Sequence, residues 1–306
     1  MSATFGSYNI KRVIFHKETT FGVDESITWT PVGGVEEITA RPILQFAENR
    51  NLTQTPGDHQ LTRQHAEITL RGSIKRNRAS PSWKWTDFAY YILATVNTGS
   101  VEDTIASLAL AAQLDVATDQ FKVWRGIKLD RVTISSRIGE SVKFEIHGLA
   151  HSESPWVTAD PVSGTIQASI ESSGQAMHLF SNTNVAVGGQ YGTGYSSIRP
   201  RLSDWSFTVE RTLVPQGTDA DDPTRWRIFS ESEKNYRANA SLDFTSNDEY
   251  NNYVNATKRS LRLTDNDGYI LELTSGQWMT GELPIRSADL IANPLTFEAT
   301  GARTSF

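Results

Sequence analysis

The chain has 306 residues, contains no cysteine and carries a formal net charge of −6 at pH 7. Without cysteine it cannot hold a disulfide framework, a thiolate metal site or a cysteine nucleophile. The modest acidity argues against a dedicated nucleic-acid binder, which normally presents a basic face. At this length the chain can form two domains that each bury a core, and its many Thr, Ser, Val and aromatic residues favour strands.

Neither a signal peptide nor a membrane-spanning segment is predicted. The first residues, MSATFGSYNIKRVIF, lack the continuous apolar core of a signal peptide, and no apolar run reaches the roughly 18 residues needed to cross a bilayer. We therefore expect a soluble protein that is synthesised in the cytoplasm and has no membrane partner.

The first quarter of the chain predicts strands joined by turns. Three short strands are expected first, over residues 8–16, 28–31 and 35–38. A longer strand should begin over residues 41–52, and a returning strand should occupy residues 66–74. The segment between them, residues 53–65, is polar and contains Pro56-Gly57. It predicts a long projecting hairpin tip, because nothing in it could be buried.

The next segments predict a short helix and then a strand. Apolar residues at helical spacing predict a helix over residues 86–96, namely Phe88, Tyr91, Ile92, Thr95 and Val96. The alanines of residues 107–116 would suit a helix, but its larger apolar residues alternate with other positions. We predict a strand there, because the matching segment at residues 260–264 is followed by an Asp-Gly hairpin.

The clearest local prediction is a β-hairpin over residues 126–150. Apolar residues alternate with polar ones along both arms, which is typical of half-buried strands, at Ile127, Leu129, Val132, Ile134, Val142, Phe144 and Ile146. The turn is expected at residues 137–140, where Gly139 can adopt the positive φ that a tight antiparallel turn often needs.

The second half repeats this order after an unpatterned start. Residues 152–200 are rich in Ser, Gly, Thr and Asn and predict a linker, with loose strands at residues 165–169 and 177–180. A strand then runs from residue 202 to 213, followed by a projecting tip to residue 225, a returning strand to residue 244 and a helix over residues 246–257. Its capping box is Ser246 with Glu249, and its apolar stripe is Tyr250, Tyr253 and Val254.

Short matches at consistent spacings predict a tandem duplication. The segment from Phe144 to Gly148 matches the segment from Phe297 to Gly301, and Ser107 matches Ser260, both at an offset of 153 residues (297 − 144 and 260 − 107). Phe46, Arg50 and Leu52 match Phe207, Arg211 and Leu213 at an offset of 161 (207 − 46). We expect a first domain over residues 1–155 and a second over residues 156–306, with a linker-rich start at about residues 152–200. The alternative is that strand-rich sequences match by chance.

Tests for catalytic chemistry give no candidate. The sequence has no GxSxG, phosphate-loop, dinucleotide-binding or HExxH motif. His147 and His151 could form a metal pair, although ordinary surface imidazoles are far more common. The acidic segments at residues 219–222 and 265–268 lack the spacing of an EF-hand and predict turns. We therefore expect no enzyme activity, no cofactor and no metal, although scattered carboxylates leave a glycosidase pair open.

One basic cluster stands out, formed by Arg71, Lys75, Arg76 and Arg78. It could contact nucleic acid. A solvated strand end or a set of interface ion pairs is the commoner role for such a cluster, and we favour it.

Several segments spread over nearly the whole chain resemble one protein family. They are KETTFG at residues 17–22, the long hairpin, the short helix, the hairpin G-x-x-L-D-R-x-T-I-S followed by G-E-x-V-K-F-x-x-x-G, and a second such unit that ends at the C-terminus. Together they look like the tail tube proteins, or major tail proteins, of long-tailed bacteriophages. Within that family the chain resembles the group that has two tube domains in one polypeptide.

The resemblance implies a mainly β fold, with two tandem antiparallel β-sandwich or half-barrel domains that each have one short flanking α-helix. Copies would join edge to edge into a trimeric, pseudo-hexameric ring, and rings would stack into a hollow tube. Viral DNA would pass through this tube into the host without specific binding. The implied partners are the chain itself, a tape-measure protein and tail-end or baseplate proteins, and the implied location is the virion.

Contacts between subunits or rings are expected at the two hairpin tips. The residues concerned are Thr55, Pro56, Gly57, Asp58, His59, Gln60, Gln216, Gly217, Asp219, Asp221 and Asp222. Each predicted domain also ends in exposed strands, an aggregation hazard that ring closure would remove. Two alternatives remain open: a tandem β-sandwich module that binds carbohydrate or a receptor, and a glycan-active enzyme.

Overall fold

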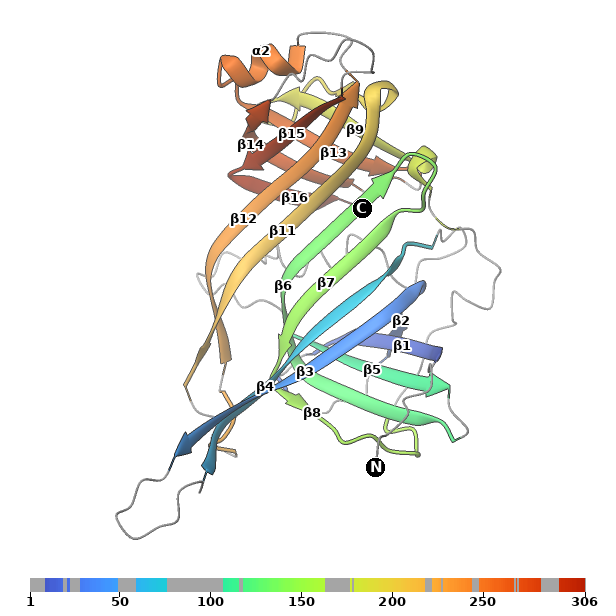
Figure 1. Cartoon of the computed structure of the whole chain (residues 1–306), viewed down its shortest axis with the longest axis vertical. Coiled ribbons are helices and arrows are strands. Elements are labelled where there is room, and N and C mark those ends of the chain that lie inside the picture. Colours follow the sequence, from blue (N-terminus) through green and yellow to red (C-terminus); the bar gives the residue numbers. More distant parts are fainter. Residues whose placement is uncertain are drawn as a thin grey trace.

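A computed structural model describes residues 9–18, 21–22, 28–48, 59–75, 107–115, 118–162, 177, 179–217, 222–226, 228–243, 248–266, 268, 270–281 and 292–305. Figure 1 shows a mainly β, elongated molecule with long strands that run diagonally along it. Helical structure in these residues is confined to the short helix α2 (Asp248–Val254) and to 3-10 turns at Phe180–Asn182 and Arg199–Arg201.

All ladders between the named strands are antiparallel. In chain order the strands are β1 (Asn9–Lys17), β2 (Thr30–Pro31), β3 (Val35–Glu48), β4 (His59–Ser73), β5 (Leu108–Asp115), β6 (Gln120–Arg137), β7 (Lys143–Ala150), β8 (Ser152–Glu153), β9 (Thr183–Gly189), β10 (Ser196–Ser197), β11 (Leu202–Gln216), β12 (Ile228–Asp243), β13 (Arg259–Asp265), β14 (Ile270–Gly281), β15 (Ala292–Ala299) and β16 (Gly301–Ser305).

The long strands form one continuous layer, which we call the central sheet. Its strand order is β3-β4-β7-β6-β11-β12-β15-β14. Two smaller layers pack against it. One contains β1, β2, β5, β8 and the beginning of β6, and the other contains β9, β10, β13, β16 and the beginning of β14. The molecule therefore consists of two β-sandwiches that share one sheet.

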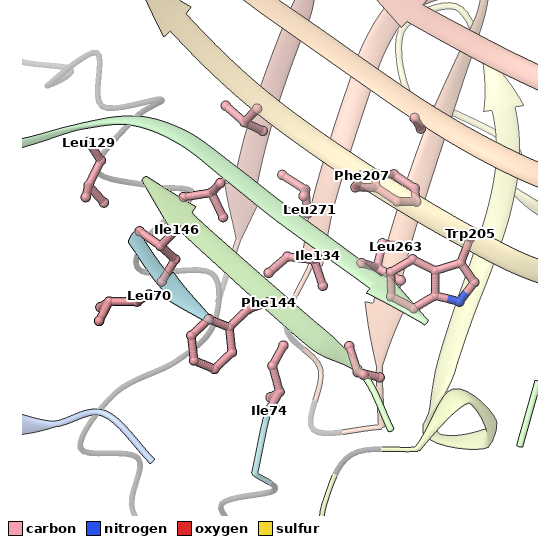
Figure 2. Packing of buried hydrophobic residues seen from close by; sticks show 14 of the residues in the cluster. Leu70, Ile74, Leu129, Ile134, Phe144, Ile146, Trp205, Phe207, Leu263 and Leu271 are labelled. Carbon is pink, nitrogen blue, oxygen red and sulfur yellow. The ribbon is translucent and has the colours of Figure 1, made fainter. Parts of the chain in front are cut away.

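The apolar core continues from one sandwich into the other. Figure 2 shows Ile134 of β6 and Phe207 of β11 in the same cluster as Leu263 of β13 and Leu271 of β14. Alternation along each central strand produces this core, because every second side chain points into the space between the layers. The two halves are thus joined by buried side chains as well as by backbone hydrogen bonds.

Two strands, β6 and β14, belong both to a smaller layer and to the central sheet. β6 pairs with β5 up to Ile127 and with β11 from Arg131 onward. At the corner of β6, Gly126 has a φ of 63°, and at the corresponding corner of β14, Ser275 has a φ of 54°. A residue with positive φ forms a bulge that bends a strand from one layer into the next.

The pairing scheme of the first half recurs in the second. The pairs β1–β2, β1–β5, β5–β6, β6–β7, β6–β8, β4–β7 and β3–β4 correspond to β9–β10, β9–β13, β13–β14, β14–β15, β14–β16, β12–β15 and β11–β12. The β6–β11 ladder joins the halves, and we call it the internal joint. The division into domains at residue 155 stays a prediction.

The ladders correct the predicted offset between the hairpins. Lys128 faces Leu149, and Gln277 faces Glu298, which is an offset of 149 residues on both strands (277 − 128 and 298 − 149). Trp124 and Glu153 correspond in the same way to Leu273 and Ala302 (273 − 124 and 302 − 153). The match of Phe144 with Phe297 at 153 is therefore four residues out of register, and the match of Ser107 with Ser260 is two residues out, because β5 and β13 are offset by 151 (259 − 108). When two strands are misaligned by an even number of residues, every side chain stays on its own face of the sheet. The alternation of apolar and polar residues therefore could not reveal this error.

A second correction concerns the strands that begin the two long hairpins. β3 has a bulge between Val35 and Glu37, and β11 has one between Leu202 and Asp204. Aligning these bulges gives an offset of 167 (202 − 35), so the predicted offset of 161 is wrong. In the ladders Phe207 corresponds to Ala40 (207 − 167).

The predicted hairpin at residues 126–150 is confirmed as β6 and β7. Gly139 has a φ of 82°, and the N–H of Glu140 donates to the carbonyl of Arg137 at 2.9 Å, which closes the turn. The register shifts once, between Leu129 and Arg131. The strand predicted at residues 107–116 is confirmed as β5.

The prediction for the first long hairpin is wrong in two respects. Residues 35–38 and 41–48 form one strand, β3, and not two. The predicted irregular tip contains the start of β4, whose first residue His59 faces Glu48 of β3. Polar residues suit a strand here because the hairpin extends beyond the core, as Figure 1 shows at lower left. Residues 49–58 lie outside the described part of the chain.

The segment predicted as a linker contains an ordered strand that the sequence did not reveal. β9 pairs with both β10 and β13. It ends in Gly188 and Gly189, and glycine weakens the sequence signal of a strand. The loose strand expected at residues 177–180 is replaced by isolated bridges at Met177 and Leu179 and a 3-10 turn. The strand expected at residues 165–169 lies outside the described residues.

The second predicted helix is confirmed as α2. Tyr253 packs against the core as expected, but Val254 is 59% exposed and does not belong to the apolar stripe. The capping residue Ser246 and the first predicted helix, residues 86–96, are not among the described residues.

Phe297 provides a test of the shared core. Its side chain is fully buried, its ring centroid lies 5.1 Å from that of Trp278, and a Cβ added to Gly276 would lie 2.5 Å from it. We expect Phe297→Ala to lower the free energy of unfolding by about 3–5 kcal/mol, because it removes a buried ring and leaves a cavity. Urea denaturation measures this loss. Thr296→Ala, on the opposite face of β15, is the matched control and should change stability by less than about 1 kcal/mol; equal losses would contradict the assigned faces.

Candidate functional site

The face of the central sheet that points away from the core, which we call the polar face, is the largest candidate surface. In most of its strands, partly or fully exposed polar residues stand between buried ones. Its described acidic residues include Glu37, Glu67, Asp130, Glu145, Asp204, Glu210 and Glu298, and its described basic residues include Arg41, Arg71, Arg131, Arg137, Lys143 and Arg237. Among these described residues the two signs nearly balance, so this part of the face lacks the basic excess that would hold a polyanion.

A shallow polar groove on this face crosses the internal joint. It is lined by Arg131, Thr133, Glu145, Thr208, Glu210, Asn235, Arg237 and Asn239. The hydroxyl groups of Thr133 and Thr208 lie 3.1 Å apart across the joint, and the Asn239 amide donates to the Ser206 hydroxyl at 3.2 Å. These short polar side chains mostly satisfy one another, so the groove presents hydrated polar groups and no apolar binding pocket.

The carboxylate of Glu145 is engaged by two guanidinium groups. Its Oε2 accepts from Arg71 Nε at 2.9 Å, and its Oε1 accepts from an Arg131 nitrogen at 3.1 Å. Arg71 also donates to Glu37 at 3.2 Å. Arg71 thus forms ion pairs within the central sheet, and the predicted interface ion pairs stay a prediction. Arg76 and Arg78 lie outside the described residues.

The two histidines considered as a metal pair have different surroundings. His147 Nδ1 pairs with a carboxylate oxygen of Asp130 on the polar face. His151 is buried, and its ring centroid lies 5.2 Å from that of Phe21. The described residues contain no group of three or more His, Asp or Glu side chains arranged to hold a metal ion.

The pKa of His147 is raised above its usual 6.5, because Asp130 accepts a hydrogen bond from the ring and stabilises its charged form. Partial burial opposes this effect but does not outweigh it. The pair therefore places one pH-sensitive contact on the polar face.

A second contact between the halves lies at the far end of the central sheet. We call residues 222–226 the strap. The backbone N–H of Gln64 in β4 donates to the carbonyl of Thr224 at 2.7 Å, and the Gln64 side chain donates to the Thr224 hydroxyl at 3.2 Å. Phe229, at the start of β12, is completely buried beside the rings of His65 and Phe21. The sequence offered no signal for this contact, because its partners are 160 residues apart.

A buried carboxyl group, Glu18, supports the corner of β6 near the strap. Its two oxygens accept from the backbone N–H groups of Gly126 at 2.9 Å and Gly22 at 3.1 Å. Burial raises the pKa of Glu18, and these hydrogen bonds oppose the rise. A carboxyl group with a raised pKa can indicate catalysis. Here both oxygens are occupied by the backbone, so its role is to hold the corner.

Only part of the predicted contact set lies in the described residues. Thr55, Pro56, Gly57, Asp58, Asp219 and Asp221 lie outside them. His59 and Gln60 begin β4, and Gln216 ends β11 before Gly217, whose φ is 69°. Asp222 belongs to the strap, where it accepts from the Thr224 hydroxyl at 2.6 Å and pairs with Arg225 at 2.9 Å. The assignment of these residues to contacts between copies stays a prediction.

None of the helices in the described part of the chain has the length and hydrophobicity of a membrane span.

The pair of His147 and Asp130 gives a pH-dependent test. The folded-state pKa of His147 is raised. The contribution of the His147–Asp130 pair to stability is therefore complete when the pH is below the unfolded-state pKa of about 6.5, and it is lost as the pH rises through the folded-state pKa. We expect Asp130→Asn to remove this contribution, which is at most about 1 kcal/mol for a partly exposed pair. Titration of the His147 ring by NMR should show its pKa falling in this variant. Glu298→Gln, elsewhere on the polar face, should leave it unchanged; an unaltered pKa in Asp130→Asn would contradict the assignment.

No family model matches the chain, and no curated protein has a matching sequence. What the surfaces can do is therefore inferred from their geometry and from the resemblance in the sequence.

Proposed function

We propose that this protein is a structural subunit that assembles into stacked rings and forms the hollow tail tube of a long-tailed bacteriophage. The observation that carries the proposal is the internal joint: two units with the same pairing scheme are joined edge to edge by β6 and β11. Each unit has two sheet edges. Inside the chain, one edge of each unit is paired with the other unit, and the second edge can form the same contact with a further copy. Such head-to-tail contacts form a ring when the rotation closes.

The proposed ring contains three chains, so that six similar units surround the axis. In this arrangement the central sheets merge into one barrel, which removes their open edges. The smaller layers pack on the core side of the central sheet, and so they form the outside of the ring. The polar face then lines the channel.

A nearly balanced polar lining suits a conduit for DNA. Phosphate groups bind proteins chiefly by displacing condensed counterions at clusters of Lys and Arg. On the polar face, basic groups such as Arg71 and Arg131 are already paired with Glu145. DNA would therefore meet a hydrated wall with little net attraction, and no base-specific contact is needed. The tape-measure and tail-end partners follow from the resemblance alone.

The proposal can be tested by electron microscopy combined with thiol labelling, because the chain contains no cysteine. We expect the purified protein to form rings or tubes with an axial channel. Asn239→Cys places a thiol on the polar face, and Tyr191→Cys places one at an outer position where the native side chain is 75% exposed. A bulky maleimide reagent should label both variants before assembly. In assembled tubes a reagent that is wider than a DNA duplex should label only Tyr191→Cys, because it cannot enter a channel that is sized for DNA.

Two outcomes would contradict the proposal. The first is equal labelling of both thiols in assembled particles, which would remove the polar face from the channel. The second is a discrete monomer that forms neither rings nor tubes at high concentration. A monomer that binds saccharide would instead favour the alternative of a carbohydrate-binding module.

A further inference from the structure

The internal joint has a defined register. Seven residues of β11 pair with seven residues of β6, from Asp204 facing Arg137 to Glu210 facing Arg131. Acidic and basic residues face each other at both ends of this ladder, and opposite charges across a sheet stabilise a pair. The joint also buries Phe207 and Val209 of β11 beside Ile134 of β6. It is therefore specified by backbone, charge and apolar packing together.

The repeated pairing scheme identifies the strands that correspond to this joint at the outer ends of the chain. At the offset of 167, residues 204–210 of β11 correspond to residues 37–43 of β3 (204 − 167 and 210 − 167). At the offset of 149, Arg131 and Val132 of β6 correspond to Thr280 and Gly281 of β14 (131 + 149 and 132 + 149). The equivalents of the two joined strands are thus β3 and the end of β14.

Both of these strands have an open edge in the described part of the chain. β11 lies between β12 and β6, whereas its equivalent β3 pairs with β4 only. Arg131 and Val132 lie between β7 and β11, whereas Thr280 and Gly281 pair with β15 on one side and with no strand described on the other. An open strand edge is a template for another strand.

We propose that β3 of one chain pairs with the end of β14 of a second copy, antiparallel and in the register of the internal joint. In that register Ile43 faces Thr280 and Pro42 faces Gly281, as Glu210 faces Arg131 and Val209 faces Val132. This inference rests on the proposed function, because it names the strands through which copies join within a ring. The internal joint is the template, and the contact between chains repeats it.

Pro42 is the one residue of β3 that could argue against this pairing. Proline has no N–H, and edge strands often carry it to discourage association. It removes a single donor from the segment of residues 37–43, while the other N–H and carbonyl groups that point away from β4 remain on the open edge. One lost donor weakens an isolated edge and so discourages non-specific pairing, but it leaves the other hydrogen bonds along this edge of β3 available.

Paired cysteines give a direct test. Cross-strand partners in a ladder lie close enough for a disulfide, and the native chain has no competing thiol. Under mild oxidation of the assembled protein, Ile43→Cys with Thr280→Cys should give disulfide-linked multimers on a non-reducing gel. The matched control is Arg131→Cys with Glu210→Cys, which has the same register within one chain and should give an intramolecular disulfide without multimers. Each single variant should remain unlinked.

Microscopy of the same samples separates this inference from the proposed function. Tubes without linked multimers, while the control closes, would overturn the pairing of β3 with β14 and leave the tube in place. Absence of both tubes and multimers would overturn both. Multimers from either single variant alone would also overturn the pairing, because they would show non-specific contact.

Hydrogen exchange of the unmodified protein provides a second measurement that depends on no variant folding. Those N–H groups of residues 37–43 that point away from β4 should exchange at least about tenfold more slowly in assembled particles than in the free chain, because new ladder hydrogen bonds protect them. Residues 204–210, already paired on both sides, serve as the internal control and should show little change. Equal exchange of residues 37–43 in the two states would overturn the inference.

Discussion

The structure depends on the hydrogen-bonding requirement of strand edges. Every backbone N–H and C=O that leaves water needs a partner, and a sheet meets this need everywhere except at its two outer strands. In this chain β6, at one edge of the first unit, forms its missing backbone hydrogen bonds with β11 of the second unit. The joint extends the central sheet and merges the two apolar cores, so that Ile134 and Phe207 pack in one cluster. After this joint has formed, the backbone groups that still lack a strand partner in the described residues are those at the outer edges of β3 and the end of β14.

The corners of β6 and β14 allow one strand to serve two layers. Gly126 and Ser275 adopt positive φ at equivalent places, and each donates its N–H to the residue that follows the first strand of its unit. In the first unit the N–H of Gly126 donates to buried Glu18, and in the second the N–H of Ser275 donates to the carbonyl of Gln190. The bend is thus conserved in geometry within the chain while its acceptor changes from side chain to backbone. Without the bend, β6 could not leave β5 and reach β11.

Much of this architecture could be predicted from alternation, and its failures have physical causes. The hairpin of β6 and β7 was predictable because seven apolar residues alternate around a glycine turn. The offset between the units was not, since a slip of an even number of residues preserves every face. β9 was missed because two of its seven residues are glycine. The strap was missed because the contact of Gln64 with Thr224 depends on tertiary placement, which no local pattern records.

The two units differ most where their layers face away from the joint. In the first unit Ala111 faces Val123 in the ladder, and both pack with buried Trp29, which precedes β2. In the second unit the equivalent ladder pair is Arg262 with Glu272. The Arg262 guanidinium lies 3.6 Å from the ring centre of Tyr195, which precedes β10, and burial together with Glu272 raises the pKa of Tyr195 to about 12. An apolar cluster and a charged one thus occupy the same place without altering the ladders around them. Side chains of the outer layer can vary this widely because strand pairing, bulges and corners fix the backbone, and it is the backbone edge that the proposed contact between copies requires.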